Sequence, residues 1–175
     1  MALLLTFLLF AISVSFLCSL LESVLLSVPH SHVAALAEQG NVTGTRLRQM
    51  KDDINQPLAA ILTLNTFAHT LGAAGVGAEA AILWGEAWVG LVSFVVTLLI
   101  LIFSEIIPKT LGAEHAKGLA PLAAWIIQVL TVVLRPIVAA CNWIPKLLSK
   151  RGQRGPRLSR DEVRSLANLA GEEGA

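Results

Sequence analysis

Long apolar runs separated by short polar connectors dominate the chain. The runs cover approximately residues 2–28, 57–76, 87–107 and 119–144. Their apolar positions are continuous and do not alternate with polar ones, so the pattern predicts helices and not strands. A helix needs about 20 predominantly apolar residues to cross a bilayer. The pattern therefore predicts an all-α membrane protein, with transmembrane helices in the first three runs.

The connectors between these runs carry the turn signals. The first, residues 30–56, is polar and opens with a segment, 31–39, that predicts a short helix ending near Gly40. Pro57, a residue favoured in the first turn of a helix, opens the second span. Residues 77–86 form the second connector, which contains two glutamates and no basic residue.

The fourth run is interrupted by the pair Arg135-Pro136, which leaves two apolar pieces, 119–134 and 137–144. Both pieces are short for a bilayer, and an interior proline breaks or kinks a helix. The fold that we expect is three transmembrane helices plus a bent, interfacial or re-entrant helical hairpin on the cytoplasmic side. The alternative is a fourth crossing with a proline kink and an arginine that extends to the headgroups.

Composition and charge support a membrane protein and indicate its orientation. The chain is 55% hydrophobic, with a mean hydropathy of +0.70. The first connector contains three basic residues and the second none, and Lys109 and Lys117 follow the third span. By the positive-inside rule, we expect a multi-pass protein of the cell (inner or plasma) membrane with its N-terminus outside and its C-terminus in the cytoplasm.

The C-terminal tail differs from the rest of the chain. Seven of the 13 Lys and Arg residues lie between Lys146 and Arg164. We expect a membrane domain over residues 1–145 and a basic-then-acidic cytoplasmic linker over 146–175, with a helix starting at the capping pair Ser159 and Glu162. The basic tail could attract anionic lipid headgroups. It has no interleaved aromatic residues, so we expect no nucleic-acid partner, and no enzyme motif occurs.

The residues best suited to carry chemistry lie at the end of the third run. Ser104 and Glu105 precede Pro108 and Lys109 at the boundary of an apolar segment. An ionisable residue at such a position is expensive and indicates a functional site. Pro108 has no N–H group, so the Ser104 carbonyl loses its usual helical partner and could bind protein, water or a cation.

Each of the three spans also carries polar side chains at helical spacing, and such faces are expected to pack against one another. The three sets are Ser15, Ser19, Glu22 and Ser23; Asn65, Thr66, His69 and Thr70; and Ser93, Thr97, Ser104 and Glu105. Hydroxyl, amide, carboxylate and carbonyl oxygens are hard ligands that suit Mg²⁺, Ca²⁺ or Na⁺. A single glutamate compensates only part of a divalent charge, which favours exchangeable binding.

Each polar residue also has a structural interpretation. Serine and threonine in membrane helices bond their own backbone or hold helices together. Glu105 could pair with Lys109 four residues later, Glu22 could lie at the cytoplasmic headgroups, and His69 could bond a neighbouring helix or act as a proton-sensitive gate.

The segment Ser104-Glu105-Ile106-Ile107-Pro108-Lys109-Thr110-Leu111-Gly112 resembles the motif that closes the third helix of the CNNM/CorC (cyclin M-like) transmembrane domain. Residues 16–23 resemble the first-helix motif of that family, residues 62–66 its second-helix glycine–asparagine motif, and residues 158–174 the linker before its paired CBS domains. We therefore expect this transmembrane domain without its CBS pair.

The resemblance implies a homodimer that transports Mg²⁺ coupled to Na⁺. Carried onto this chain, it implies an ion site at Ser19, Ser23, Asn65, Ser104 and Glu105. Pro108 and Lys109 form the helix break, and the accessory candidates are Glu22, Thr66 and His69. The chain departs from the family pattern at Leu64, where the family has glycine, and at His69, where it has a second asparagine.

Two functions are compatible with this sequence. One is a divalent cation transporter domain that binds a partly hydrated ion between three helices. The other is a non-transporting membrane anchor, in which the polar faces only hold the helices together and a cytoplasmic module regulates another protein.

Overall fold

The computed structural model describes residues 1–148 of the chain, and the side chains of residues 1–140. Every regular element in this part is a helix, which confirms the all-α prediction. The elements are α1 (Ala2–Ser27), α2 (His30–Glu38), α3 (Val42–Asp52), α4 (Asn55–Trp84), α5 (Glu86–Leu99), the π-helix η1 (Ile100–Ile106), α6 (Ile107–Glu114) and α7 (Ala116–Leu148).

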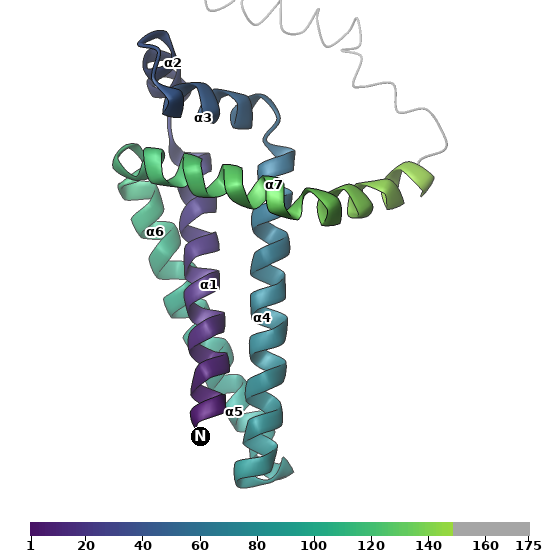
Figure 1. The fold of residues 1–175 in the computed structure, drawn as a ribbon. Coiled ribbons are helices and arrows are strands. Elements are labelled where there is room, and N and C mark those ends of the chain that lie inside the picture. The colour runs from purple at the N-terminus through teal and green to yellow at the C-terminus, as the bar shows by residue number, and fades with distance from the viewer. Residues whose placement is uncertain (149–175) are drawn as a thin grey trace, which may run out of the picture. The chain divides into compact units, whose positions relative to one another are not determined.

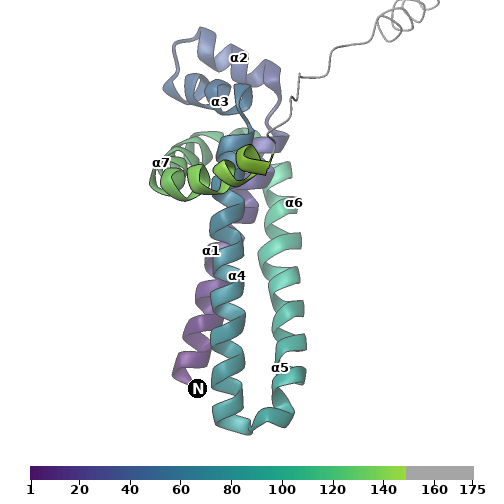
Figure 2. The same cartoon turned by 90° about the vertical axis from the view of Figure 1, so that its right-hand side faces the viewer.

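Three long helices run side by side in the compact unit formed by Met1–Ala139. They are α1, α4 and the continuous run of α5, η1 and α6 (Figures 1 and 2). The chain reverses between α4 and α5 at the end of the bundle where the N-terminus lies (Figure 2). Helix α1 contacts α4, η1 and α6, so it is the central helix of the bundle.

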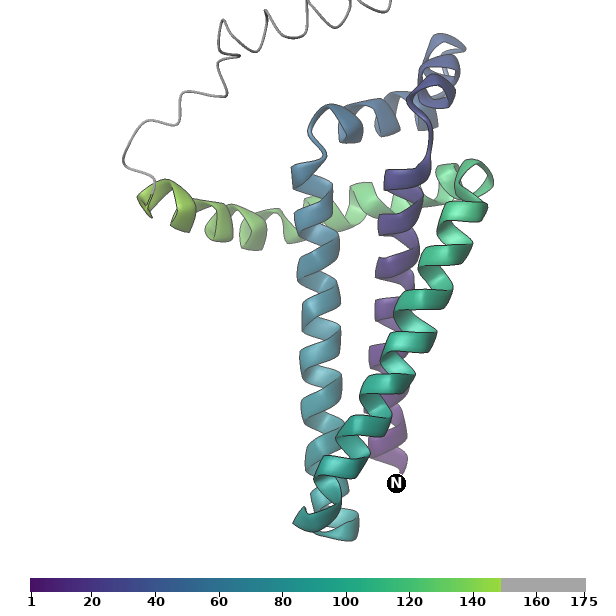
Figure 3. The same cartoon turned by 180° about the vertical axis from the view of Figure 1, so that it is seen from behind.

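Four segments are long and apolar enough to cross a membrane, judged by length and composition: Ala2–Ser27, Asn55–Trp84, Glu86–Glu114 and Ala116–Ala140. The first three are the long helices of the bundle. The part of α7 within the compact unit runs across them, near the end of the bundle where α1 finishes and α4 begins (Figures 1 and 3).

The predicted helical hairpin in the fourth run is wrong. Helix α7 continues through Arg135 and Pro136 without a break. Its buried residues in the described part recur at helical spacing on both sides of the proline: Ala116, Ala120, Ala123, Ala124, Ile127 and Val138. Packing of this face holds the helix together, and the carbonyl that Pro136 leaves without its usual partner belongs to Val132, which is 65% exposed.

The predicted second connector is also wrong in most of its length. Helix α4 continues for two turns beyond the expected end and finishes at Trp84. The alanines of residues 78–81 favour helix, and the chain turns only at Gly85, whose φ of 88° suits glycine. Glu79 therefore lies in the last part of α4.

The short helix expected at residues 31–39 is confirmed as α2, which is followed by Gly40 with a φ of 72°. The next helix, α3, is capped by Asn41, whose side-chain oxygen accepts a hydrogen bond of 2.8 Å from the Thr43 N–H. Helices α2 and α3 pack on each other. Gly44 makes this possible, because a Cβ there would meet the backbone of Leu36 and Ala37.

Apolar side chains form two clusters in the described part. The larger includes Leu21, Val24 and Leu25 of α1 with Ala120, Ala123 and Ile127 of α7. The smaller, near the N-terminal end, joins Leu4 to Val76, Ala80 and Val96. A second compact unit begins at Ala140, and the predicted linker helix at Ser159–Glu162, like the basic tail from Lys150, lies outside the described residues.

Candidate functional site

Helices α1 and α4 bring two of the predicted polar faces together. The Ser15 hydroxyl and His69 Nε2 are hydrogen-bonded at 2.6 Å, and Ser15 is fully buried. One turn away, Gly72 of α4 packs directly against Ala11 of α1. The two helices are antiparallel, so a step of one turn forward on α1 matches a step of one turn back on α4. Ser19 therefore lies level with Asn65.

These two residues carry oxygen atoms that lack a protein partner. Ser19 is 1% exposed. Within the described part of the chain, its Oγ and the Oδ1 atom of Asn65 are both buried without a hydrogen bond. A buried polar group without a partner costs about 1–3 kcal/mol, and unexplained cases in native proteins often mark a site for water or an ion.

The third long helix changes its winding beside this region. Residues Ile100–Ile106 form a π-helix, and the Ile107 N–H bonds the Ile102 carbonyl five residues back. Such turns occur mostly as single bulges and frequently at functional sites. Ser104 is fully buried, and its hydroxyl donates a 2.6 Å hydrogen bond to the Ile100 carbonyl. Its side chain therefore already has a partner.

Pro108, immediately after the π-helix, is buried where α6 meets α1. Beside it, the Ser23 hydroxyl donates a 2.6 Å hydrogen bond to the Lys109 carbonyl. Gly112 comes so close to α1 that a Cβ there would lie 2.8 Å from the Leu20 carbonyl oxygen. The helix break predicted at Pro108 and Lys109 is wrong, because η1 continues into α6 without a gap. The proline instead follows a π-helix and lies beside a close contact between two helix backbones.

The charged candidates separate into a pair and a single residue. Lys109 Nζ lies 3.8 Å from Glu22 Oε2, and not beside Glu105 as the alternative interpretation had it. These two side chains line a hollow of about 290 Å³ together with Ser23, Leu26 and Ser27. Glu105 is half-buried and makes no ion pair with any described residue.

Other polar candidates do not reach the bundle interior. Thr66 is exposed, and its hydroxyl bonds the Leu62 carbonyl of its own helix at 2.9 Å. Thr97 likewise bonds the Ser93 carbonyl at 2.8 Å and is exposed. The prediction that every polar face points toward the other spans therefore holds for α1 and for part of α4. On the third helix it holds for Ser104 in η1 and not for Ser93 and Thr97 in α5.

The donor set at the α1–α4 contact fits a hard cation. No group of three or more His, Cys, Asp and Glu side chains occurs together among the described residues. What remains are a hydroxyl and a carboxamide oxygen at this contact and the half-buried carboxylate of Glu105 on the third helix. All are oxygen donors of the type that Mg²⁺ accepts alongside water. The sequence did not indicate the π-helix or the close approach at Gly112.

Comparison with known proteins identifies the family. Residues 4–175 match the cyclin M (CNNM) transmembrane N-terminal domain, which is nearly the whole chain. The chain belongs to the CNNM transmembrane domain family. The family match confirms the resemblance inferred from the third-helix motif. The family is one of transporter-type proteins and not of enzymes.

Relatives of the chain include bacterial proteins, one of which is named as an inner membrane protein. The chain is 35% identical to the UPF0053 protein sll1254 of Synechocystis over 158 residues, which are 90% of this chain and 45% of that protein. It is 23% identical to the UPF0053 inner membrane protein YfjD of Escherichia coli over 129 residues, 74% of this chain and 30% of YfjD. The chain thus spans less than half the length of these relatives.

Proposed function

We propose that this CNNM domain carries Mg²⁺ across the membrane through a site between α1, α4 and the helix formed by α5, η1 and α6. The observation that supports this most is the pair of buried oxygens at Ser19 and Asn65, which lie level with each other and have no hydrogen-bond partner among the described residues. Buried oxygens without protein partners are suited to a transient ligand that supplies positive charge.

The proposed protein ligands would fill only part of the coordination shell of the ion. Ser19 Oγ and Asn65 Oδ1 are neutral donors, and Glu105 supplies one negative charge from the neighbouring helix. Mg²⁺ retains several waters and demands octahedral geometry, so a few protein oxygens with water in the remaining positions would hold it weakly. Weak binding allows the ion to leave, as transport requires.

Ser23 and Ser104 would not bind the ion directly but would hold the backbone of the third helix in place. Their hydroxyls already donate to the Lys109 and Ile100 carbonyls. They would fix the path of the third helix around Pro108, where the π-helix can convert to α-helix by small changes in winding. The Glu22–Lys109 pair lines the hollow at the end of this path and would attract and release the ion.

The placement in the membrane follows from charge. The first connector, with Arg46, Arg48 and Lys51, would be cytoplasmic and the α4–α5 turn external. Helix α7 would then lie in the cytoplasmic interface, across the ends of three transmembrane helices. Transport would be coupled to Na⁺ and carried out by a homodimer, as the family resemblance implies. The name of the relative YfjD, an inner membrane protein, supports a location in the cell membrane.

Flux in proteoliposomes tests this function. Asn65→Ala should lower Mg²⁺ uptake at least about tenfold, because it removes a buried oxygen of the charged ion's coordination shell and such interactions contribute about 1.5–3 kcal/mol. Glu105→Gln should have an effect of similar direction. A fluorescent Mg²⁺ indicator inside the vesicles gives the initial rate.

Thr97→Ala is the matched control, because that hydroxyl is exposed and bonds only its own helix. Flux of Thr97→Ala should remain within about twofold of the unmodified domain. If the unmodified domain moves no Mg²⁺, or if Asn65→Ala and Thr97→Ala transport equally, the transport site is refuted.

The membrane-anchor function has its own structural support. The Ser15–His69 and Ser23–Lys109 hydrogen bonds join helices, as polar residues do in any stable membrane bundle. The absence of flux from a folded, reconstituted domain would favour this second function.

A further inference from the structure

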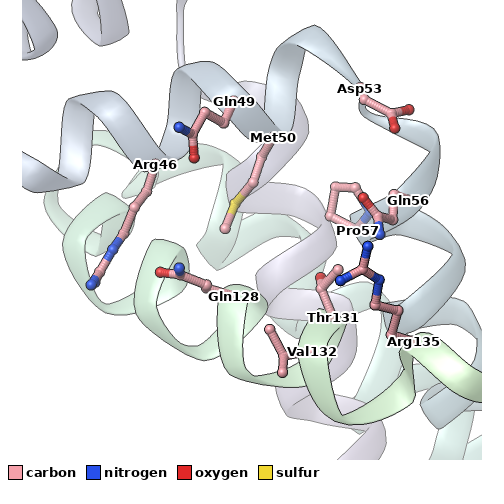
Figure 4. Close-up of a pocket in the computed structure, with 10 residues that line it drawn as sticks. All are labelled: Arg46, Gln49, Met50, Asp53, Gln56, Pro57, Gln128, Thr131, Val132 and Arg135. Atoms are coloured by element: carbon pink, nitrogen blue, oxygen red, sulfur yellow. The ribbon is translucent and has the colours of Figure 1, made fainter.

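A pocket outside the proposed transport path lies between α3, the start of α4 and the middle of α7 (Figure 4). Its volume is about 260 Å³. Two arginines and several amide or hydroxyl side chains supply most of its polar lining: Arg46, Gln49, Gln56, Gln128, Thr131 and Arg135.

The arginines lie at opposite ends of this pocket, with Gln128 and Thr131 of α7 between them (Figure 4). Neither Arg46 nor Arg135 forms an ion pair with another described residue. A guanidinium group that pairs with no carboxylate can bind two oxygens of one phosphate group through two of its N–H groups. The pocket thus presents two guanidinium groups that form no ion pair with a described carboxylate.

Two further features favour a negatively charged group in the pocket. The Thr131 hydroxyl oxygen is buried and has no hydrogen-bond partner among the described residues. Gln56 and Pro57, at the start of the 30-residue helix α4, also line the pocket, and no side chain caps that helix. The free N–H groups and positive end of a long helix attract anions.

One carboxylate opposes this arrangement. Asp53 also lines the pocket. It is exposed to solvent, as Arg135 is, whereas Arg46 is partly buried, so the charge of Asp53 is screened no less than that of Arg135. Two positive charges and a helix N-terminus outweigh one exposed negative charge.

An apolar groove adjoins the pocket and shares Arg46, Gln128 and Val132 with it. Its other lining residues are Trp125, Val129 and Val133, and its volume is about 320 Å³. Trp125 is 57% exposed, and tryptophan is enriched at membrane interfaces. A cationic pocket continuous with an apolar groove matches a molecule with a phosphate at one end and an acyl chain at the other.

We propose that this pocket and groove bind one anionic phospholipid, with its phosphate between Arg46 and Arg135 and an acyl chain along Trp125, Val129 and Val133. The proposal rests on the placement of α7 at the membrane surface given under Proposed function. It assigns a structural ligand to the contact between α3, α4 and α7, separate from the transported ion.

The test measures ligand-induced thermal stabilisation of the full chain in non-ionic detergent without Mg²⁺. The probes are dioctanoyl phosphatidylglycerol, dioctanoyl phosphatidylcholine with the same chains, and glycerol phosphate without chains. Only the phosphatidylglycerol should raise Tm at low concentration. The double variant Arg46→Gln/Arg135→Gln should weaken its apparent Kd about twenty-five-fold, about fivefold for each arginine.

The matched control is Arg48→Gln/Lys117→Gln, which removes the same charge from exposed positions on α3 and α7 outside the pocket. Its apparent Kd should change less than about threefold, because neither side chain lines the pocket and the field of an exposed charge is screened by salt. Equal weakening in both double variants would refute the site. Equal stabilisation by glycerol phosphate would overturn the lipid as occupant in favour of a soluble phosphate.

If the double glutamine variant does not fold, Arg46→Lys/Arg135→Lys and Thr131→Val take its place. Lysine keeps the positive charge but cannot bind two phosphate oxygens at once, so lipid binding should weaken several-fold. Unchanged lipid binding in both variants would refute the site. Because the assay contains no Mg²⁺, its failure leaves transport untouched. Lipid binding by a domain without flux would instead refute transport alone.

Discussion

Ser15 and Ser19 lie one turn apart on the same face of α1. Of these two serines, only Ser15 has a hydrogen-bond partner among the described residues. Ser15 bonds His69, whereas the Ser19 hydroxyl is buried without a partner. The interpretation that these serines only hold helices together by hydrogen bonds therefore accounts for Ser15 and not for Ser19. Functional sites often lower the stability of the ligand-free protein, because their groups are arranged to bind a ligand and not to stabilise the fold. The unpartnered Ser19 hydroxyl is such a group.

This difference predicts opposite effects of two chemically identical substitutions. Ser19→Ala removes an unsatisfied buried hydroxyl and should leave the ion-free domain equally stable or up to about 1 kcal/mol more stable. Ser15→Ala leaves His69 without its partner and should cost about 1 kcal/mol. Thermal unfolding in detergent, with and without Mg²⁺, measures both.

The Mg²⁺-dependent rise in Tm separates the two roles further, because a ligand stabilises the state that binds it. The rise should be lost in Ser19→Ala and kept in Ser15→Ala. If Mg²⁺ stabilises both variants equally, Ser19 does not bind the ion.

At the scale of elements, the contact between α1 and α6 depends on the absence of a side chain at Gly112. A Cβ there would lie 2.8 Å from both the Leu20 carbonyl oxygen and Ser23 Cβ. This contact holds the Ser23 hydroxyl against the Lys109 carbonyl. Close backbone approach at small residues is a usual way for membrane helices to associate.

Gly112→Ala should therefore destabilise the domain by about 1–3 kcal/mol, because the added methyl group forces two helices apart. Gly90→Ala is the matched control, since Gly90 is in α5 and has nothing within 4 Å of the position that a Cβ would occupy. It should be neutral or stabilising by up to about 1 kcal/mol. Denaturant unfolding compares the two, and equal stability would contradict the packing at Gly112.

The sequence predicted the helices well and their ends less well. Apolar runs located α1, α4 and the third span, because hydropathy over 20 residues is a strong signal. The extension of α4 through Glu79 and the continuity of α7 through Pro136 were missed. In both cases a local signal for a turn was weaker than the helix propensity and packing on either side of it.

The site was predicted in part for similar reasons. Helical spacing placed Ser15, Ser19 and Ser23 on one face. Helix α4 contacts that face at Ser15 and α6 contacts it at Ser23. Spacing within one helix gives no information about register between helices, so the Ser15–His69 bond and the pairing of Lys109 with Glu22 could not be derived. The pocket of Arg46 and Arg135 joins residues far apart in sequence, and no local pattern indicated it.

At the scale of the whole molecule, the account requires one orientation. Arg46, Arg48 and Lys51 lie on α3 or its end, near the end of the bundle that α7 crosses, while the turn at Gly85 lies at the other end (Figures 1 and 2). The positive-inside rule places the first group in the cytoplasm. The N-terminus and Ala87 would then face the outside.

Thiol labelling of intact cells tests this orientation. Cys18 and Cys141, the two native cysteines, are first replaced by alanine. A membrane-impermeant maleimide should then label Ala87→Cys in intact cells, and Thr45→Cys only after permeabilisation. Both positions are exposed in the structure. The reverse pattern would invert the proposed topology.

The central claim is that a hard cation occupies the space between α1 and α4, and an experimental structure at high Mg²⁺ concentration tests it most directly. The account predicts ordered density about 2.1 Å from Ser19 Oγ and Asn65 Oδ1, lost in Asn65→Ala. Density at hydrogen-bonding distance from both atoms, about 2.8 Å, and unchanged without Mg²⁺, would show a structural water and contradict the claim.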